Sequence, residues 1–545
     1  NALTALTDGQ YNVAIGRSAL GANKQNDHNT AVGYNALSAM SGSSTGSTNN
    51  TAVGSWAGYR VTTGLANTFI GQYAGQAITT GNYNNFMGAQ AGHKTTTGGY
   101  NISIGMESSY HNEAGSFNTV MGHKAGQYMT GSNNVYLGME AGKGGNTSAP
   151  YSSAGNNVAV GQYALNVVTS GGQNVAIGNR ALINLRHGIQ STALGYGAGY
   201  YATGSENTFL GFNAGYGGTS SAPHSSGERN TAVGRSALVN FTTGGYNTAI
   251  GYGAGYNISS GSYNVVMGYN AGYSLGGTQY NVMIGDYAGA VSNTINNRHT
   301  YVGYAAGRYV DTGLANVAIG FEAMESANSS TDNNASYNVA VGYQALEKIT
   351  DANYNTAVGM YAGQNNTTGG LNTFIGKNSG QHLSTGIQNT MVGIESGLNS
   401  TDVDKTVLIG NNAGRGGLTS AADGTIIIGH EAGYGLTSAS GNTIIGYRAA
   451  RSGVSDIYSA VIIGYEAMYS NTDSSGNIAI GHFALRQGSG GSSRDYNVAI
   501  GQDAMRNSNP HVSIAIGKDA GNYLKDGATG AVHIGHEAGT YMSGS

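Results

Sequence analysis

A five-residue pattern of polar and apolar positions recurs along the whole chain. It reads Asn-(Thr/Val)-x-(Ile/Val)-Gly, and its glycine falls thirty times between Gly16 and Gly535. Of the twenty-nine intervals between successive glycines, seventeen are 17 residues long and the others run from 16 to 23. Repeats built from helix pairs or propeller blades need about 34 to 50 residues. The period therefore predicts an all-β fold, a parallel β-solenoid (β-roll) of about 30 coils.

With the glycine as position zero, the residues at −1 and −3 are aliphatic or β-branched. Position −1 is Ile, Val, Leu or Met in all thirty coils, and position −3 is Thr, Val or Ile in twenty-nine. Residues two apart share one face of a strand, and β-branched side chains suit that pleated surface. We expect this face to point into the coil and to form the structural core. The predicted core residues at −1 include Ile15, Val32, Val53, Ile70, Ile177, Ile250 and Ile500.

Position −2 points to the opposite face of the strand, yet it is apolar or aromatic in twenty-eight coils and most often Ala. A strand that is apolar on both faces is normally covered on both. The simplest cover for the second face is identical chains wound around a shared axis. The predicted interface between chains includes Ala14, Ala31, Ala52, Phe69, Phe86, Ala159 and Ala176. The alternative is that these mostly small side chains face solvent.

Position −4 is Asn in twenty-three of the thirty coils. Stacked coils would align these side chains about 4.8 Å apart, the spacing of neighbouring strands. At that spacing each amide can donate to one neighbour and accept from the other. We therefore predict an Asn ladder, which begins with Asn12, Asn29, Asn50, Asn67, Asn84, Asn101 and Asn118.

The composition is consistent with a stacked fold and argues against nucleic acid and membranes as partners. Gly accounts for 92 of 545 residues and charged residues for 9%, the net charge is −4, and Cys is absent. We expect a single repetitive shaft over 1–545, as part of a longer fibre protein, because a solenoid grows in one dimension. No basic stripe favours nucleic acid. No apolar run approaches the roughly 20 residues of a membrane span, so we expect no membrane insertion by this segment.

Two features suggest contact with a ligand. Insertions interrupt the period near 41–49, 143–155, 216–228, 325–336, 415–424 and 486–495, and insertions in repeat proteins often lie on the binding face. The chain also has 38 Tyr and one Trp, and aromatic side chains can form platforms for glycans. The candidate contact residues are Trp56, Tyr252 and Tyr269; the alternative is that such rings stack between coils.

The sequence shows no sign of an enzyme. Zinc-protease spacing, phosphate loops and calcium loops are absent, as is a Cys nucleophile. We expect no catalytic, cofactor-binding or metal-binding residues. Carboxylates two residues after the coil glycine rarely occur in adjacent coils, so a polysaccharide-cleaving tailspike would need to pair them from loops or across chains.

The phrases Asn12-Val13-Ala14-Ile15-Gly16 and Asn497-Val498-Ala499-Ile500-Gly501 resemble the head repeats of trimeric autotransporter adhesins of the YadA type. The longer unit from Asn247 to Tyr256 is similar to repeats of bacteriophage tail fibres. The resemblance covers essentially the whole chain and implies a homotrimeric fibre. The usual period is longer than the adhesin head coil, which implies an extra surface turn.

These observations lead to one main functional hypothesis and three alternatives. The main one is a non-enzymatic fibre or adhesin shaft, extracellular, on a virion appendage or on a bacterial cell surface, that positions a receptor-binding element. The first alternative is an adhesin whose own surface binds a cell-surface glycan or receptor. A polysaccharide-cleaving tailspike and an ice-binding solenoid are the others; the latter needs an exposed array of Thr, whereas Thr at −3 is expected on the inner face.

Overall fold

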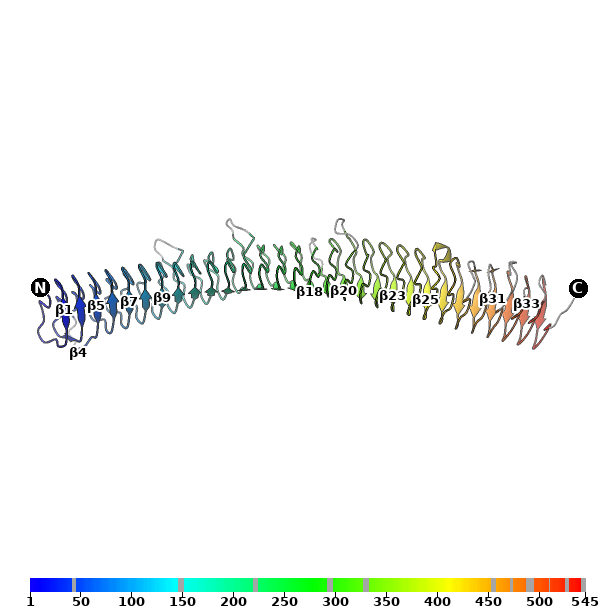
Figure 1. Ribbon diagram of the computed structural model, residues 1–545, viewed down its shortest axis with the longest axis horizontal. Coiled ribbons are helices and arrows are strands. Elements are labelled where there is room, and N and C mark those ends of the chain that lie inside the picture. Colours follow the sequence, from blue (N-terminus) through cyan, green and yellow to red (C-terminus); the bar gives the residue numbers. More distant parts are fainter. Residues whose placement is uncertain are drawn as a thin grey trace. The chain divides into compact units, whose positions relative to one another are not determined.

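The computed structural model describes residues 1–41, 46–145, 151–218, 224–291, 298–326, 333–451, 457–470, 474–486, 495–508, 510–524 and 529–540. The chain divides into two compact units, Asn1–Gly277 and Thr278–Ser545. Each unit is a parallel β-solenoid with a repeat of about 17 residues, in which one short strand per coil lies beside the strand of the next coil (Figure 1). The predicted all-β parallel β-solenoid is therefore confirmed.

In the first unit, fifteen three-residue strands form the main sheet of the described residues. They are β1 (Val13–Ile15), β3 (Thr30–Val32), β5 (Thr51–Val53), β6 (Thr68–Ile70), β7 (Asn85–Met87), β8 (Ile102–Ile104), β9 (Thr119–Met121), β10 (Val135–Leu137), β11 (Val158–Val160), β12 (Val175–Ile177), β13 (Thr192–Leu194), β14 (Thr208–Leu210), β15 (Thr231–Val233), β16 (Thr248–Ile250) and β17 (Val265–Met267). A second, two-stranded sheet pairs β2 (Asn26–Asp27) with β4 (Gly46–Ser47).

The second unit repeats this arrangement with fifteen further strands. They are β18 (Val282–Ile284), β19 (Thr300–Val302), β20 (Val317–Ile319), β21 (Val339–Val341), β22 (Thr356–Val358), β23 (Thr373–Ile375), β24 (Thr390–Val392), β25 (Val407–Ile409), β26 (Ile426–Ile428), β27 (Thr443–Ile445), β29 (Val461–Ile463), β31 (Ile478–Ile480), β32 (Val498–Ile500), β33 (Ile514–Ile516) and β34 (Val532–Ile534). A two-stranded sheet pairs β28 (Ile457–Tyr458) with β30 (Ser474–Ser475). The only helical element among the described residues is the 3₁₀ turn η1 (Ser420–Ala422). The described part of the chain contains no helix long and apolar enough to cross a membrane.

The register of the sheet places equivalent coil positions side by side. Strand β1 pairs with β3 so that Ala14 faces Ala31 and Ile15 faces Val32, and the later pairs follow the same rule. The insertions change the interval between coils but not this register: β10 and β11 are 23 residues apart and still align Tyr136 with Ala159. Each coil position therefore generates a column of side chains that runs along the unit.

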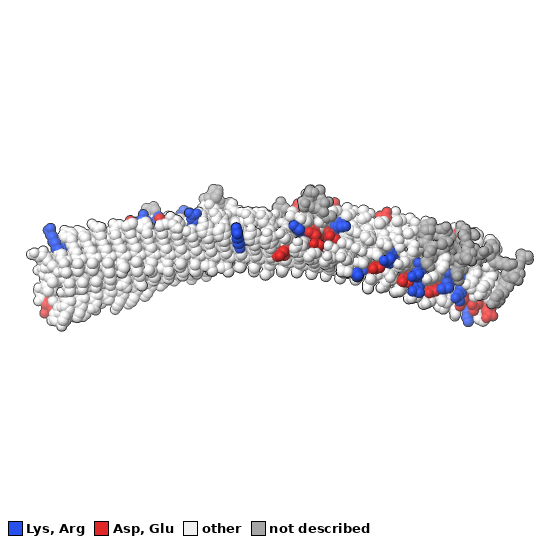
Figure 2. Space-filling model, viewed as in Figure 1, with Lys and Arg blue, Asp and Glu red and all other residues white. Residues whose placement is uncertain are grey.

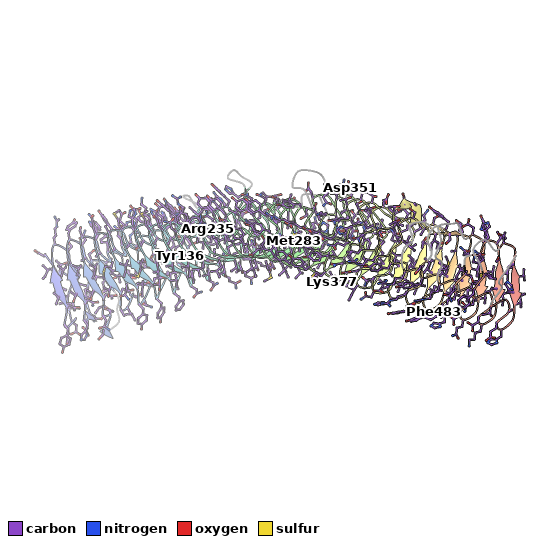
Figure 3. All side chains as sticks on the ribbon, turned by 45° about the vertical axis from the view of Figure 1, so that its right-hand side comes forward. Tyr136, Arg235, Met283, Asp351, Lys377 and Phe483 are labelled. Atoms are coloured by element: carbon purple, nitrogen blue, oxygen red, sulfur yellow. The ribbon has the colours of Figure 1, made fainter. Side chains whose placement is uncertain are left out.

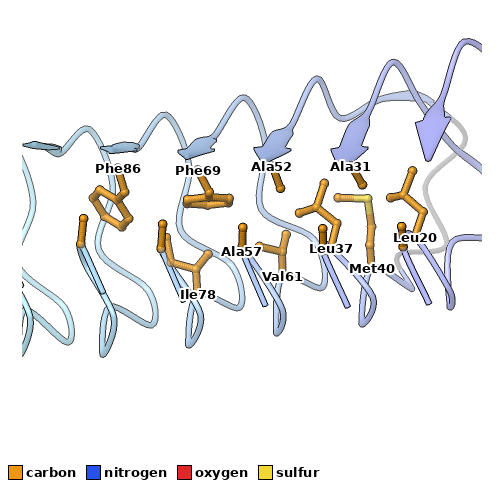
Figure 4. Close-up of a cluster of buried hydrophobic side chains, with 14 residues drawn as sticks. Leu20, Ala31, Leu37, Met40, Ala52, Ala57, Val61, Phe69, Ile78 and Phe86 are labelled. Atoms are coloured by element: carbon orange, nitrogen blue, oxygen red, sulfur yellow. The ribbon is translucent and has the colours of Figure 1, made fainter. Parts of the chain in front are cut away.

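The structure reverses the predicted faces of the strand. The residue at −2 points into the coil, and Ala31, Ala52 and Phe69 are fully buried there. The close-up in Figure 4 shows these side chains directed from the sheet towards Ala57 and Val61 on the opposite wall. Of the residues labelled in Figure 3, Tyr136 in the first unit and Met283 in the second are buried at position −2, whereas Lys377 is exposed. The residues at −1 and −3, predicted as core, flank the inward side chain and face out.

The reason for the reversal is the narrow interior of the coil. The opposite wall carries Ala at +3 and either Gly or a larger residue at +4, and each three-residue strand directs only one side chain inward. Six coils have Phe or Tyr at −2, and all six have Gly at +4: Phe69 with Gly75, Phe86 with Gly92, Tyr136 with Gly142, Phe209 with Gly215, Tyr301 with Gly307 and Phe374 with Gly380. In nine of the ten coils with Leu or Met at +4, position −2 is Ala, as in Ala31 with Leu37; Ile462 with Met468 is the exception. The two positions share one volume, as close packing requires.

The corner at +4 has one backbone conformation whichever residue occupies it. Gly58 has φ of 58°, and Leu20 and Leu37 have φ of 48° and 47°. Coils with Gly and coils with Leu at +4 therefore turn this corner in the same way. Leu accepts the left-handed conformation, at a cost of about 1–2 kcal/mol, because its side chain fills interior space beside a small residue at −2.

Candidate functional surfaces

The outer face of the main sheet has a continuous apolar column at −1 in each unit, beside a column at −3 in which Val and Ile are mixed with Thr and, in one coil, Asn85. It consists of two columns, the residues at −3 and at −1, and we call it the sheet face. Ile15 is 61% exposed, Val53 39% and Ile177 36%. The other predicted core residues lie on the same face: Ile70 is exposed, and Val32, Ile250 and Ile500 are partly exposed. Soluble monomers rarely expose a contiguous apolar patch of this kind.

The predicted interface residues are correspondingly misassigned. Ala31, Ala52, Phe69, Phe86, Ala159 and Ala176 are buried inside the coil, and Ala14 in the first coil is partly buried. Enclosed side chains of this kind cannot contact a second chain. If copies of the chain associate along a strand surface, the sheet face and not the Ala column makes the contact.

The Asn residues at −4 form a buried, hydrogen-bonded column. Asn84 Nδ2 donates to Asn67 Oδ1 (3.1 Å) and to the carbonyl of Gly98 (2.9 Å), and Asn84 Oδ1 accepts from the backbone N–H (3.1 Å) and Nδ2 (3.0 Å) of Asn101. All four hydrogen-bonding positions of this amide are thus used inside the protein. The same links run between consecutive members of the predicted set: Asn12, Asn29, Asn50, Asn67, Asn84, Asn101 and Asn118. Between Asn29 and Asn50 the backbone N–H alone makes the link. With no polar group left over for a ligand, the column is structural.

At His299 a histidine takes the place of Asn in the −4 column, and the sequence analysis did not identify this residue. Its backbone N–H donates to Asn281 Oδ1 (2.9 Å), and its Nδ1 accepts from the backbone N–H of Asn316 (3.1 Å). The imidazole is fully buried and stacks on Tyr301 with ring centroids 4.7 Å apart. Burial lowers the pKa of His299 to about 3, because the buried environment disfavours the charged form. The only sequence signal was the replacement of Asn at a −4 position.

Many exposed aromatic rings stack face to face between neighbouring coils. Tyr252 and Tyr269, two predicted contact residues, have ring centroids 5.2 Å apart with an angle of 11° between planes. Tyr83, Tyr100 and Phe117 form a three-ring stack with centroids 4.8 and 5.1 Å apart. Each stacking contact covers one face of both rings, so a ring inside a stack, such as Tyr100, presents mainly its edge and hydroxyl group to solvent.

A different arrangement surrounds Trp56, the third predicted contact residue. Trp56 meets Tyr34 at 76° with centroids 5.6 Å apart and meets Tyr59 at 63° with centroids 4.4 Å apart. The contacts continue coil by coil, and we call the set the aromatic strip: Tyr34, Trp56, Tyr59, Tyr73, His93, Tyr110, His111, Tyr128 and Tyr151. All members except the exposed Tyr34 are half-buried. The strip therefore mixes edge-to-face contacts, three of which involve Trp56 or Tyr73, with stacked contacts such as that between His93 and Tyr110.

Ion pairs connect neighbouring coils in the second unit. Glu431 accepts from Arg448 (2.8 Å) and Arg451 (2.6 Å), and Glu466 contacts Arg486 (2.8 Å). The hydrogen bond from Arg451 is the main reason that the pKa of Glu431 lies below its usual range. Figure 2 shows that charged side chains of both signs alternate over this unit. The arginine side chains are about a third exposed or less and the glutamates more buried still, so these pairs are partly shielded from solvent and link the coils that they join.

Two groups of titratable side chains lie close enough to share a cation. Glu322, Glu325 and Glu347 form one, and burial and the charge of Glu322 raise the pKa of Glu325. Their carboxylates are engaged by Gln344, Arg308 and Gln364. The second group is Asp519, His536 and Glu537. Asp519 and Glu537 also line a hollow of about 520 Å³ together with Asn522, Tyr523 and Thr540.

The predicted insertion loops are described only in part. Residues 42–45, 146–150, 219–223, 327–332 and 487–494 lie outside the described residues. The insertion at 415–424 is described completely and contains η1, whose Ala422 is buried. Ser420 N–H donates to the carboxylate of Asp402 in the preceding coil (3.1 Å). This insertion therefore packs on the solenoid.

Comparison with known proteins does not assign the chain to a family. No protein-family model matches the chain, and none of the curated proteins is significantly similar to it. Arguments about function therefore rest on the residues and surfaces described above.

Proposed function

We propose that the chain is a non-enzymatic structural segment of an extracellular fibre, which self-associates and holds a receptor-binding element away from its base. The sheet face carries this proposal. Fifteen strands about 4.8 Å apart make a face about 70 Å long in each unit, and two outward columns give it a width of about 10 Å. The resulting area of about 700 Å² in one unit approaches the roughly 800 Å² per partner of a standard stable interface.

A second copy of the same chain is the occupant that this surface suits best. Its columns repeat with the strand spacing, so only a partner with the same period can match them along their whole length. The surface is rich in Ile and Val and lacks charge, as do the cores of permanent interfaces. We propose three copies around a common axis, following the resemblance to trimeric fibre repeats; a virion appendage or a bacterial cell surface is the corresponding location.

Light scattering on the purified full chain tests the proposal. A mass three times the 55.4 kDa of one chain is the expected result. A mass of two chains would support self-association through face-to-face sheets and overturn the trimer. A monomer would overturn the fibre proposal, because the apolar face would then have no protein cover.

One observation bears on the ice-binding alternative. Thr at −3 lies on the outer face and not inside, so the objection based on its predicted position no longer holds. The Thr column is nevertheless broken, for example by Val135, Val158 and Val175 in three successive strands. Thermal hysteresis above that of buffer, shown by a monomeric chain, would favour ice binding over the fibre.

A further inference from the structure

Two cationic side chains lie beside the half-buried aromatic strip. Arg60 and Lys94 are both exposed, and neither forms a salt bridge within the described residues. Both lie near the ring of His93, since their charges, after burial, help to hold its pKa below the usual value. Among the other cations of the first unit, Lys124, Lys143 and Arg229 pair with glutamates, and Arg235 lies over the rings of Phe212 and Tyr252.

The two cations repeat with the solenoid. Arg60 follows Gly54 by six residues and Lys94 follows Gly88 by six, so they occupy the same coil position two coils apart. That separation corresponds to about 10 Å along the unit. Tyr73 belongs to the coil between them, and Trp56 and Tyr59 belong to the coil of Arg60. All three rings are half-buried; Trp56 meets Tyr59 at 63° and Tyr73 at 26°. Half-buried aromatic rings and two cations thus occur within three successive coils.

We propose that this strip, centred on Trp56, Tyr73 and His93, binds an extended acidic polysaccharide. Aromatic rings pack against the apolar faces of pyranose rings, and Arg60 and Lys94 pair with carboxylates on alternate sugars. Half-buried aromatic side chains combine a large apolar surface with little entropy to lose on binding. The inference is independent of the proposed self-association, because the strip lies after the coil glycine and the sheet face lies before it.

Single-stranded nucleic acid is the competing polyanion, since it also uses aromatic stacking and cations. It requires a positively charged groove that follows every phosphate. The cations beside the strip, Arg60, Lys94 and Arg17 over Tyr34, are few, and the carboxylate of Glu107 lies close enough to Tyr110 to raise its pKa, after burial. The charge density therefore suits the sparser carboxylates of an acidic polysaccharide.

Trp56 is the only tryptophan in the chain, so its fluorescence reports on this surface alone. We would titrate the full chain with a galacturonic acid hexamer at low salt and follow the emission of Trp56. The expected result is a saturable change, which weakens as salt screens the charges. Maltohexaose, poly-glutamate and an oligothymidylate are the comparison probes, and each should give a weaker response.

Substitutions can distinguish a specific binding site from non-specific electrostatic attraction to the chain. Arg60→Gln and Lys94→Gln should each weaken the affinity about threefold, the size expected for exposed charge pairs, and the double variant should weaken it further. Tyr73→Ala should also weaken binding. Two control variants should not: Lys377→Gln changes an exposed cation of the second unit that forms no salt bridge within the described residues, and Tyr100→Ala changes a ring in a face-to-face stack. No response to the hexamer, an equal response to poly-glutamate or oligothymidylate, or unchanged affinity of the double variant would overturn the proposal.

Discussion

Phe69 occupies the interior space that a side chain on Gly75 would need. A Cβ atom added to Gly75 would lie 2.5 Å from Cδ1 of Phe69, and Gly75 has φ of 58°. In other coils the space is divided the other way, as where Ala31 lies at −2 and Leu37 at +4. In coils of these two kinds the interior holds one large side chain at this level, contributed by either the strand or the opposite corner.

This relationship predicts compensation between two substitutions. Phe69→Ala should destabilise the coils around it by about 3–5 kcal/mol, because it leaves a cavity, and Gly75→Leu alone should destabilise them through overlap. The double variant reproduces the Ala–Leu combination of other coils, so it should lose less stability than the sum of the single variants. Hydrogen exchange of coils 54–92 is the measurement. Strictly additive losses would show that the two side chains do not share one space.

The reversed faces predict distinct outcomes at adjacent residues. Ile177→Glu places a charge on the sheet face and should reduce the associated mass while the coils stay folded. Ala176→Glu places the same charge inside the coil and should unfold the coils near it, because a buried unpaired carboxylate costs several kcal/mol. Gln190→Glu at an exposed corner is the matched control. Light scattering and circular dichroism separate the outcomes, and normal association of Ile177→Glu would contradict the proposed interface.

The stability of the coils around His299 should depend on pH. Its pKa is about 3 in the folded chain and about 6.5 when unfolded, so below pH 6.5 the unfolded chain binds more protons. Stability is therefore fully present above pH 6.5 and falls as the pH drops towards 3, by about 2 kcal/mol at pH 5. Local hydrogen exchange at pH 7 and pH 5 should show the loss. His299→Asn should remove it, whereas an unchanged pH dependence in that variant would assign the effect to other groups.

The Asn column should not tolerate even a substitution of nearly the same shape. Asn84→Asp removes both Nδ2 donors and places carboxylate oxygens beside Asn67 Oδ1 and the carbonyl of Gly98. We expect a loss of about 3 kcal/mol or more, because buried acceptors are left unpaired. Asn179→Asp, on a less buried amide that donates to Gln162 Oε1 (3.0 Å), should change stability by less than about 1 kcal/mol. Equal effects, measured by thermal unfolding, would argue against a buried ladder.

Much of the architecture follows from local sequence. The glycine spacing predicts the coil, and its regularity places Asn12, Asn29 and Asn50 in one column because parallel strands align equivalent positions. The stacking of Tyr252 on Tyr269 was the structural alternative that the repeat already suggested. Trp56 could be noticed as the only tryptophan, but its inclined neighbours Tyr34 and Tyr59 could not, because they come from different parts of the coil.

The sequence alone determined the repeat, the parallel stacking and the columns, because these depend on the spacing of residues along one chain. It did not decide which face of each strand points inward, since both faces are apolar and a two-residue alternation is satisfied either way. The combinations of Phe69 with Gly75 and of Ala31 with Leu37 indicate which face points inward. This combination of residue sizes can be interpreted only once the structure shows that the two positions face each other across the coil. The volume between the two walls, and not hydrophobicity, then determines which side chain fits inside.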